Sequence, residues 1–358
     1  MSMQFAIWGS NIAGGFLRSA VEQDKDASFA YNLRLAQLAD YLGYEAILYP
    51  VRYIGAIGGG NSGSGQLDPL ATAAAIAAAT RRIRLISAVL PGFLPPVTLA
   101  KMGATIDHIS SGRWHVNLVT GWFQEEQEMF GVPWIGHDER YRRSEEYIEV
   151  LKGLWQHETF TFDGHYYKIK EGRIRPFPYQ RPYPVIFQGG NSQEARNMAA
   201  RLSDWYFING APTSEIIEQI REVSEMAAQH GRTVRFAVNA FVIARESEQE
   251  AREDILERAD HSAIRQFQER AKGAEGMWTR AATVSDFVAN NEGFRTGLIG
   301  SYSQVADKIA ELRSAGVQML LLTFRFPLKE LVEFHEYVMP KMHEARTASL
   351  SNAEGHRL

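Results

Sequence analysis

Two short segments carry the groups that a phosphate-binding site requires. Gly189–Ser192 follows the apolar residues 185–187 and precedes an expected helix over 193–202. Free N–H groups at a helix start attract anions, glycines let the backbone come close, and a serine hydroxyl adds a donor. Arg140 and Tyr141 begin another expected helix, where an arginine can form paired hydrogen bonds with a phosphate. A simpler explanation also exists, because Ser192 can cap its helix and Arg140 can pair with a nearby glutamate.

Polar residues also stand at the ends of expected strands. Arg52 follows the strand 45–49, and Asn117 stands near the end of the strand that begins at Trp114. Asn239 and Phe241 are two residues apart in the expected strand 234–243, so they share one face of it. In a barrel of parallel strands, side chains at the C-terminal ends of the strands form the active site.

Other catalytic and metal-binding motifs are absent or incomplete in the sequence. Gly58, Gly60 and Gly63 match the spacing of a dinucleotide-binding loop, but no helix opens directly at these glycines. The sequence has no G-x-S-x-G nucleophile motif and no H-E-x-x-H motif, and its ten histidines are scattered. His137 and Asp138 are neighbours on a loop, where such residues more often cap a helix than act as a base. We therefore expect no metal site.

The central stretch Trp114–Tyr147 contains a strand, a long polar and aromatic loop, and a helix. Side chains alternate in type over 114–119, as in a strand, and apolar residues recur at helical spacing after residue 142. Seven similar units surround it, with expected strands at 4–8, 45–49, 83–89, 184–188, 205–208, 234–243 and 318–324. Eight such units predict an α/β fold of the (β/α)8 TIM-barrel type.

We expect one domain over residues 1–346 and a polar C-terminal tail over 347–358. Three segments do not fit the repeat and are expected to be insertion loops, at about 55–67, 122–141 and 272–298. Loops of this length are usually functional or disordered. The last of them, which holds Trp278, Phe294 and Arg295, is expected to reach the barrel mouth as a lid that excludes water.

Composition limits the class of protein. The 358 residues include no cysteine, so disulfides, thiolate metal sites and a cysteine nucleophile are excluded. A formal net charge of −4 gives no sign of a nucleic-acid or membrane partner. The N-terminus has no basic region followed by an apolar core, and no run reaches the ~20 apolar residues that span a bilayer. We therefore expect a cytoplasmic protein.

Five segments together resemble the bacterial-luciferase-like flavin monooxygenases, and the resemblance covers roughly residues 5–340. They are ATIDHISSGRWHVNLVTGW, HDERYRRSEEYIEVLKGLW, PYPVIFQGGNS, VRFAVNAFVIARE and GLIGSYSQVADKI. As a set, these segments are specific for the two-component branch of that family. The resemblance implies an enzyme that takes free reduced FMN (FMNH2) from a separate NAD(P)H-dependent FMN reductase and uses molecular oxygen as co-substrate. We also expect a homo-oligomer, either a dimer or a tetramer.

The resemblance implies roles for individual residues. The expected FMNH2 contacts are Val51, Arg52, Asn117, Glu126, Arg140, Tyr141, Gly190 and Ser192. The phosphate is expected at Arg140, Tyr141 and Ser192. The residues expected at the reacting centre are Asn117, Trp122, Asn239 and Arg325, and those expected in the substrate pocket are Trp8, Phe241 and Arg295.

Departures from the family pattern bear on the substrate. Alkanesulfonate monooxygenases have an arginine and a histidine at the strand positions held here by Asn239 and Phe241, and a tyrosine and a histidine where Arg325 and Pro327 stand. A sulfonate anion is costly to bury without cationic partners. The segments NAFVIARE, GWF, HDERYRRSEE and IFQGG are most similar to dimethyl sulfone monooxygenases. This similarity implies oxidation of a small organosulfur compound with C–S bond cleavage, from dimethyl sulfone to methanesulfinate and formaldehyde.

Several alternatives remain open from the sequence. The substrate can instead be an alkanesulfonate, or the small molecule of another FMNH2-dependent monooxygenase of the pyrimidine type. A deazaflavin-dependent oxidoreductase can be built on the same barrel. A barrel that only stores flavin is the non-enzymatic alternative.

Overall fold

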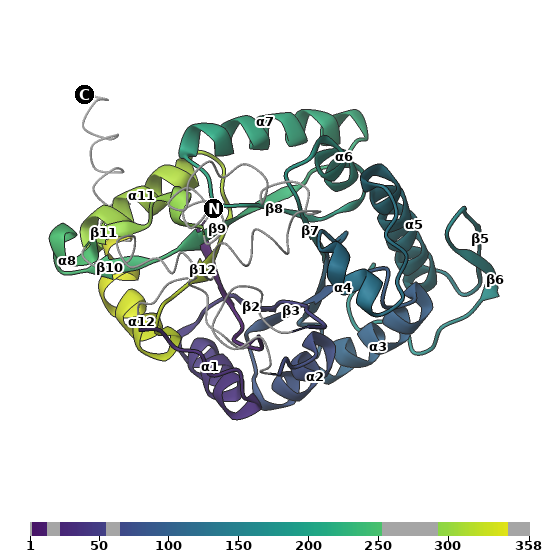
Figure 1. The fold of residues 1–358 in the computed structure, drawn as a ribbon, viewed down its shortest axis with the longest axis horizontal. Coiled ribbons are helices and arrows are strands. Elements are labelled where there is room, and N and C mark those ends of the chain that lie inside the picture. The colour runs from purple at the N-terminus through teal and green to yellow at the C-terminus, as the bar shows by residue number, and fades with distance from the viewer. Residues whose placement is uncertain (1, 13–21, 55–64, 253–292, 343–358) are drawn as a thin grey trace, which may run out of the picture.

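The computed structural model describes residues 2–12, 22–54, 65–252 and 293–342, and its centre is a closed barrel of parallel strands (Figure 1). The strands follow one another around the barrel in the order β1-β12-β9-β8-β7-β4-β3-β2. Their bounds are β1 Gln4–Trp8, β2 Ala46–Tyr49, β3 Arg84–Val89, β4 Trp114–Leu118, β7 Ile186–Gly189, β8 Trp205–Ile208, β9 Arg235–Phe241 and β12 Met319–Thr323. The predicted (β/α)8 architecture is confirmed.

Helices form a ring around the outside of the barrel (Figure 1). They are α1 Phe29–Leu42, α2 Pro69–Ala79, α3 Pro96–Ile109, α5 His137–Gln156, α6 Gln193–Leu202, α7 Thr213–Gln229, α11 Tyr302–Ser314 and α12 Pro327–Glu333, which continues into the π-helical turn Phe334–Val338. Shorter helices are α4 Gln124–Met129, α8 Glu248–Arg252 and the 3-10 turn Phe294–Thr296. In the described part of the chain, no helix is both long and apolar enough to cross a membrane.

Two apolar layers stabilise the barrel, one inside the ring of strands and one between the strands and the helices. Burying this apolar surface is the main favourable contribution to folding. All residues of β2, β4, β8 and β12 are buried, as expected for parallel strands covered on both faces. The inner layer consists of Ala6, Ala46, Leu48, Ile86, Phe187, Trp205, Phe207, Ala237, Met319 and Leu321.

A pair of buried tryptophans joins β4 to the helices beside it. Trp114 on β4 packs edge-to-face on Trp155 of α5, with ring centroids 6.3 Å apart. Gly103 of α3 lies against Trp114, where an added Cβ would come within 2.5 Å of the indole. This close packing orients β4 and α5, which carry Asn117, Arg140 and Tyr141.

The structure differs from the predicted elements in three places. Helix α5 begins at His137, a few residues before the expected start at about 140–142, so Arg140 and Tyr141 lie within its first turns. The antiparallel hairpin of β5 Phe160–Asp163 and β6 Lys168–Gly172 was not predicted, because its strands are short and largely exposed. The expected strand 234–243 is interrupted after Phe241, and β10 Ile243–Arg245 pairs with β11 Ile299–Ser301 outside the barrel.

The expected insertion loops are described to different extents. The loop 122–141 contains α4 and the start of α5. Most of the expected loop at 55–67, including Gly58, Gly60 and Gly63, lies outside the described residues, and so do Trp278 and most of the expected lid. Only residues 293–298 of that lid are described, and they include the 3-10 turn that holds Phe294 and Arg295. The expected tail 347–358 also lies outside the described residues.

Candidate active site

A cavity of about 260 Å³ opens at the C-terminal end of the barrel. It is bordered by Trp8, Leu48, Asn117, Val119, Thr120, Gly121, Trp122, His137, Arg140, Tyr141, Gly189, Gly190, Asn191, Ser192, Phe207, Ile208, Asn209, Asn239 and Leu321. Most of these residues end a strand or directly follow one, which is where (β/α)8 enzymes place their active sites. Among the described lining residues there is no carboxylate, and the only groups that can be cationic are Arg140 and His137.

One end of the cavity collects the residues in which the sequence predicted a phosphate site. Arg140, Tyr141 and Ser192 all line it, although they come from two different strand–helix units. Gly190 and Asn191, in the segment that connects β7 to α6, also line the cavity. The hydroxyl of Ser192 also accepts a hydrogen bond from the backbone N–H of Ala195 at 3.2 Å. Both explanations of Ser192 are therefore compatible, since a capping hydroxyl can also face the cavity.

The guanidinium of Arg140 is held in place by its surroundings. Arg140 is 1% exposed. Nη1 donates to the backbone carbonyl of Ile135 at 2.6 Å, and the guanidinium carbon lies 3.9 Å from the ring centroid of Trp134. A fixed cation at the wall of a cavity is suited to bind an anion, because little side-chain entropy is lost when the anion arrives.

Tyr141 reaches the same end of the cavity because the facing residue is a glycine. Burial raises the pKa of Tyr141 above its ordinary value, and a hydrogen bond with the Ser192 side chain opposes this rise. The hydroxyl is therefore protonated near neutral pH and can donate a hydrogen bond. Gly190 has a φ of +143°, and a Cβ at this position would lie 2.8 Å from the Tyr141 hydroxyl oxygen. A larger residue at 190 would push Tyr141 out of position.

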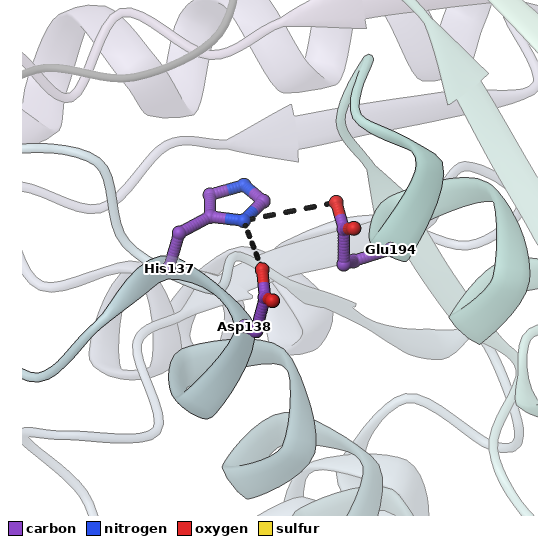
Figure 2. A group of neighbouring side chains, drawn as sticks. All are labelled: His137, Asp138 and Glu194. Carbon is purple, nitrogen blue, oxygen red and sulfur yellow. Dashed lines mark hydrogen bonds and ion pairs between the residues drawn. The ribbon is translucent and has the colours of Figure 1, made fainter.

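A histidine with two carboxylates lies at the rim beside this end. Figure 2 shows the imidazole of His137 turned toward Asp138 and Glu194, which come from α5 and α6. Nδ1 of His137 lies 3.0 Å from Oδ1 of Asp138 and 3.7 Å from Oε2 of Glu194. These atoms are close enough together to hold one ion, although no metal site was predicted. The side chain of Asp138 is 71% exposed, and a hydrogen bond from the imidazole accounts for its position.

The opposite end of the cavity is formed by β1, β9 and β12, and it is mostly apolar. Trp8 ends β1, Asn239 lies on β9, and Leu321 lies between them on β12. Leu48 and Phe207 complete this part of the lining. Trp8 Nε1 donates a hydrogen bond to Asn239 Oδ1 at 2.9 Å, which joins two residues that the sequence predicted for the substrate end. Asn117 lies on β4, and its Oδ1 is buried with no hydrogen-bond partner in the described structure.

A second group of predicted residues lies at the mouth, around Trp122. The guanidinium carbon of Arg52 lies 4.3 Å from the ring centroid of Trp122, and Arg52 Nη1 lies 3.5 Å from Oε2 of Glu126. Glu126 is 1% exposed and accepts hydrogen bonds from the backbone N–H groups of Tyr53 and Ile54 at 2.7 and 3.3 Å. Trp122 lines the cavity, whereas Val51, Arg52 and Glu126 do not. In the described structure, Glu126 therefore joins α4 to the loop after β2.

Three further predicted residues do not line the cavity in the described structure. Phe241 is fully buried and stacks on Phe294, with ring centroids 4.4 Å apart. Arg295 pairs with Glu215 at 2.6 Å. Arg325 donates to the backbone carbonyl of Glu22, and its guanidinium lies beside the Phe326 ring. None of the three lines the cavity, so their proposed contacts with substrate require a rearrangement.

Sequence reasoning did not select several of the lining residues. Asn209 directly follows β8, and Thr120 follows β4, so the rule that located Arg52 and Asn117 could also have found them. His137 was noticed in the sequence but was assigned only a capping role. Leu48 and Phe207 give no such signal, because an apolar residue inside the barrel and one at its mouth look alike in sequence.

Comparison with known proteins gives a consistent result. The luciferase-like monooxygenase family matches residues 3–319. The chain is 41% identical over 352 residues, covering 96% of both chains, to a Pseudomonas putida protein named FMNH2-dependent dimethylsulfone monooxygenase. It is 40% identical, over 99% of its length and 98% of the other, to the protein of the same name from Pseudomonas fluorescens. A crystal structure of a long-chain alkane monooxygenase has a TM-score of 0.82 at 20% identity, covering 96% of this chain and 92% of the other.

Proposed function

This chain belongs to the luciferase-like monooxygenase family, and we propose that it is an FMNH2-dependent monooxygenase that converts dimethyl sulfone to methanesulfinate and formaldehyde. The observation that carries the proposal is the near full-length identity of about 40% to two proteins named FMNH2-dependent dimethylsulfone monooxygenase. The cavity supports the proposal independently, because it has a polar end and an apolar end. The polar end suits the phosphate of a cofactor, and the apolar end suits a small neutral substrate.

The polar end of the cavity fits the phosphate of FMN. Arg140 supplies a fixed positive charge, Tyr141 a protonated hydroxyl, and Ser192 a hydroxyl at the start of α6. Charge-assisted hydrogen bonds to phosphate are stronger than neutral ones. We assign these residues to the phosphate.

A further lining residue fits the polar edge of a flavin ring. Asn117 on β4 lines the cavity, and its unpartnered Oδ1 can accept a hydrogen bond from a ring N–H. Trp122 offers an aromatic face at the mouth, held by the Arg52 guanidinium. When bound, FMNH2 supplies the two electrons with which molecular oxygen is activated. The protein's residues bind the cofactor, orient the substrate and exclude water.

The overall reaction balances without a further reactant. Dimethyl sulfone, oxygen and FMNH2 give methanesulfinic acid, formaldehyde, FMN and water, with one C–S bond broken. A separate NAD(P)H-dependent reductase is needed to return FMN to the reduced state. We also propose that the protein acts as a dimer or tetramer, as expected from the sequence.

The apolar end of the cavity supports a neutral substrate over an anion. In the described part of the chain, the groups around Trp8, Asn239 and Leu321 carry no positive charge. An anionic sulfonate buried there would lose several kcal/mol of hydration without a compensating cation. A sulfone is neutral, so hydrogen-bond donors and apolar walls are sufficient for it.

A reductase-coupled substrate panel tests the proposal. The purified protein, an FMN reductase, NADH and FMN are supplied with dimethyl sulfone, methanesulfonate or uracil. We expect formaldehyde and methanesulfinate in equal amounts from the sulfone, and sulfite release from methanesulfonate slower by about tenfold or more, given the desolvation cost. Faster release of sulfite would contradict the sulfone assignment and would make Arg325 the first residue to test. Turnover only with a reduced deazaflavin would contradict the assignment of FMNH2 as the cofactor.

A further inference from the structure

The hydrogen bond between Trp8 and Asn239 determines which way the asparagine amide faces. An asparagine side chain carries an acceptor oxygen and a donor nitrogen that can exchange places by a rotation of the amide. The indole of Trp8 has a single N–H and no acceptor, so only Oδ1 can be its partner. The distance from Trp8 Nε1 to Asn239 Oδ1 is 2.9 Å, which is typical of a well-formed hydrogen bond.

Fixing the oxygen leaves the amide nitrogen for the cavity. Asn239 lines the cavity, and its Nδ2 donates no hydrogen bond to any described residue. Nδ2 is also not fully enclosed by protein atoms, so it is open to the cavity. The backbone of Asn239 is held as well, because its carbonyl accepts a hydrogen bond from Thr296 Oγ1 at 2.7 Å. The amide is therefore a fixed donor at the apolar end.

We propose that Trp8 is a positioning residue that makes Asn239 a hydrogen-bond donor toward an S=O oxygen of the substrate, and that this pair selects oxygenated, neutral sulfur compounds. The inference rests on the proposed function and adds the contact that recognises the substrate. Leu48, Phe207 and Leu321 surround the amide with apolar surface, which suits the methyl groups of a sulfone. A sulfide has no oxygen to accept the hydrogen bond, so it would leave the donor unpaired, which is costly in a buried site.

Single substitutions at the two positions separate donor loss from loss of shape. Asn239→Asp keeps the shape but places an oxygen where the substrate requires a donor. We expect the KM for dimethyl sulfone to rise by about a hundredfold, in line with the cost of an unsatisfied and repelled buried group. Trp8→Phe keeps an aromatic ring but frees the amide to rotate, and we expect a rise in KM of about tenfold with a smaller change in kcat.

The double variant Trp8→Phe with Asn239→Ala shows whether Trp8 acts through the amide. If it does, Trp8→Phe should have almost no further effect once the amide is gone, because coupled residues are not additive. Trp155→Phe is the control, since it removes a buried indole hydrogen bond, to the Ala100 carbonyl at 3.0 Å, on the outer side of the barrel. This control should lower stability and leave the KM unchanged.

The outcomes distinguish this inference from the proposed function. Absence of product from dimethyl sulfone would refute the proposed function. The inference would then be measured on the panel of dimethyl sulfoxide, methanesulfonate and dimethyl sulfide. The same variant pattern with dimethyl sulfoxide, the neutral oxygenated compound of this panel, would support it. A preference of the wild type for dimethyl sulfide, no turnover of any oxygenated compound, or a Trp8→Phe effect that persists beside Asn239→Ala would each overturn it.

Discussion

Tyr141 provides the most direct test of the phosphate end, because it lines the cavity and its hydroxyl hydrogen-bonds with the Ser192 side chain. Tyr141→Phe removes this hydroxyl and keeps the ring that packs beside His137. We expect reduced FMN to bind more weakly by about 1.5–3 kcal/mol, the usual range for a hydrogen bond to a charged group. Riboflavin, which lacks the phosphate, should bind equally to both proteins. Anaerobic fluorescence titration of the two flavins measures this, and equal losses for both would refute the assignment.

Arg140 is a less selective probe of the phosphate than Tyr141. Arg140→Ala should also weaken the binding of reduced FMN. The substitution removes the hydrogen bond to Ile135 and the contact with Trp134 as well. Its effect therefore combines loss of phosphate binding with loosening of the segment before α5. The comparison of FMN with riboflavin is accordingly most informative for Tyr141.

The short helix α4 is tied to the loop after β2 by one buried carboxylate. Glu126 accepts from two backbone N–H groups and lies beside Arg52, which in turn stacks on Trp122. Removing the carboxylate leaves partly buried donors unpaired, each costing about 1–3 kcal/mol. Helix α4 and the loop after β2 thus form one wall at the mouth of the cavity.

Substitutions at Glu126 separate this positioning role from a contact with flavin. Glu126→Ala should destabilise the protein by about 2 kcal/mol and increase the share of oxygen released as hydrogen peroxide, since Trp122 loses its support. Glu126→Gln keeps an oxygen that can accept from Tyr53, so it should retain most of the stability and coupling. Thermal unfolding and the ratio of product to peroxide measure these effects. Identical coupling in the alanine variant would show that the wall is not needed to exclude water.

The barrel interior as a whole keeps one histidine uncharged. His115 projects from β4, is 4% exposed, and packs against the Phe187 ring at 5.9 Å. Burial, together with the charges of Arg84 and Arg235, lowers the pKa of His115 to about 3. The unfolded chain binds a proton near the ordinary pKa of 6.5, whereas the folded chain does not. The free energy of unfolding is therefore not reduced by His115 above about pH 6.5, and it falls as the pH is lowered from 6.5 toward 3.

The pH dependence of unfolding measures this contribution. Between pH 7.5 and 5.5, His115 should account for about 1.4 kcal/mol of lost stability, from the linkage of one pKa unit to 1.36 kcal/mol. His115→Gln cannot take up a proton, so its urea unfolding free energy should fall by that much less over the same interval. His165→Gln, at an exposed position, is the control. If wild type and His115→Gln lose equal stability, the histidine is not the source.

The sequence alone determined the fold and the chemistry at the level of residue types. Alternating strand and helix patterns are local, so they predicted the barrel, and the rule for strand ends located Asn117. Short exposed strands such as β5 and β6 give weak patterns, and they were missed. The start of α5 was misplaced because polar residues at a helix N-terminus resemble a loop.

Only the tertiary structure decided which of the chosen residues meet. Trp8 and Asn239 are far apart in the chain, and their contact depends on β1 and β9 both lying beside β12 in the closed barrel. Arg140 and Ser192 meet because the units of β4 and β7 are neighbours, whereas Phe241 is covered by Phe294 although it shares a strand with Asn239. Sequence spacing specifies the face of a strand, but closure of the barrel and packing of its connections determine what that face touches.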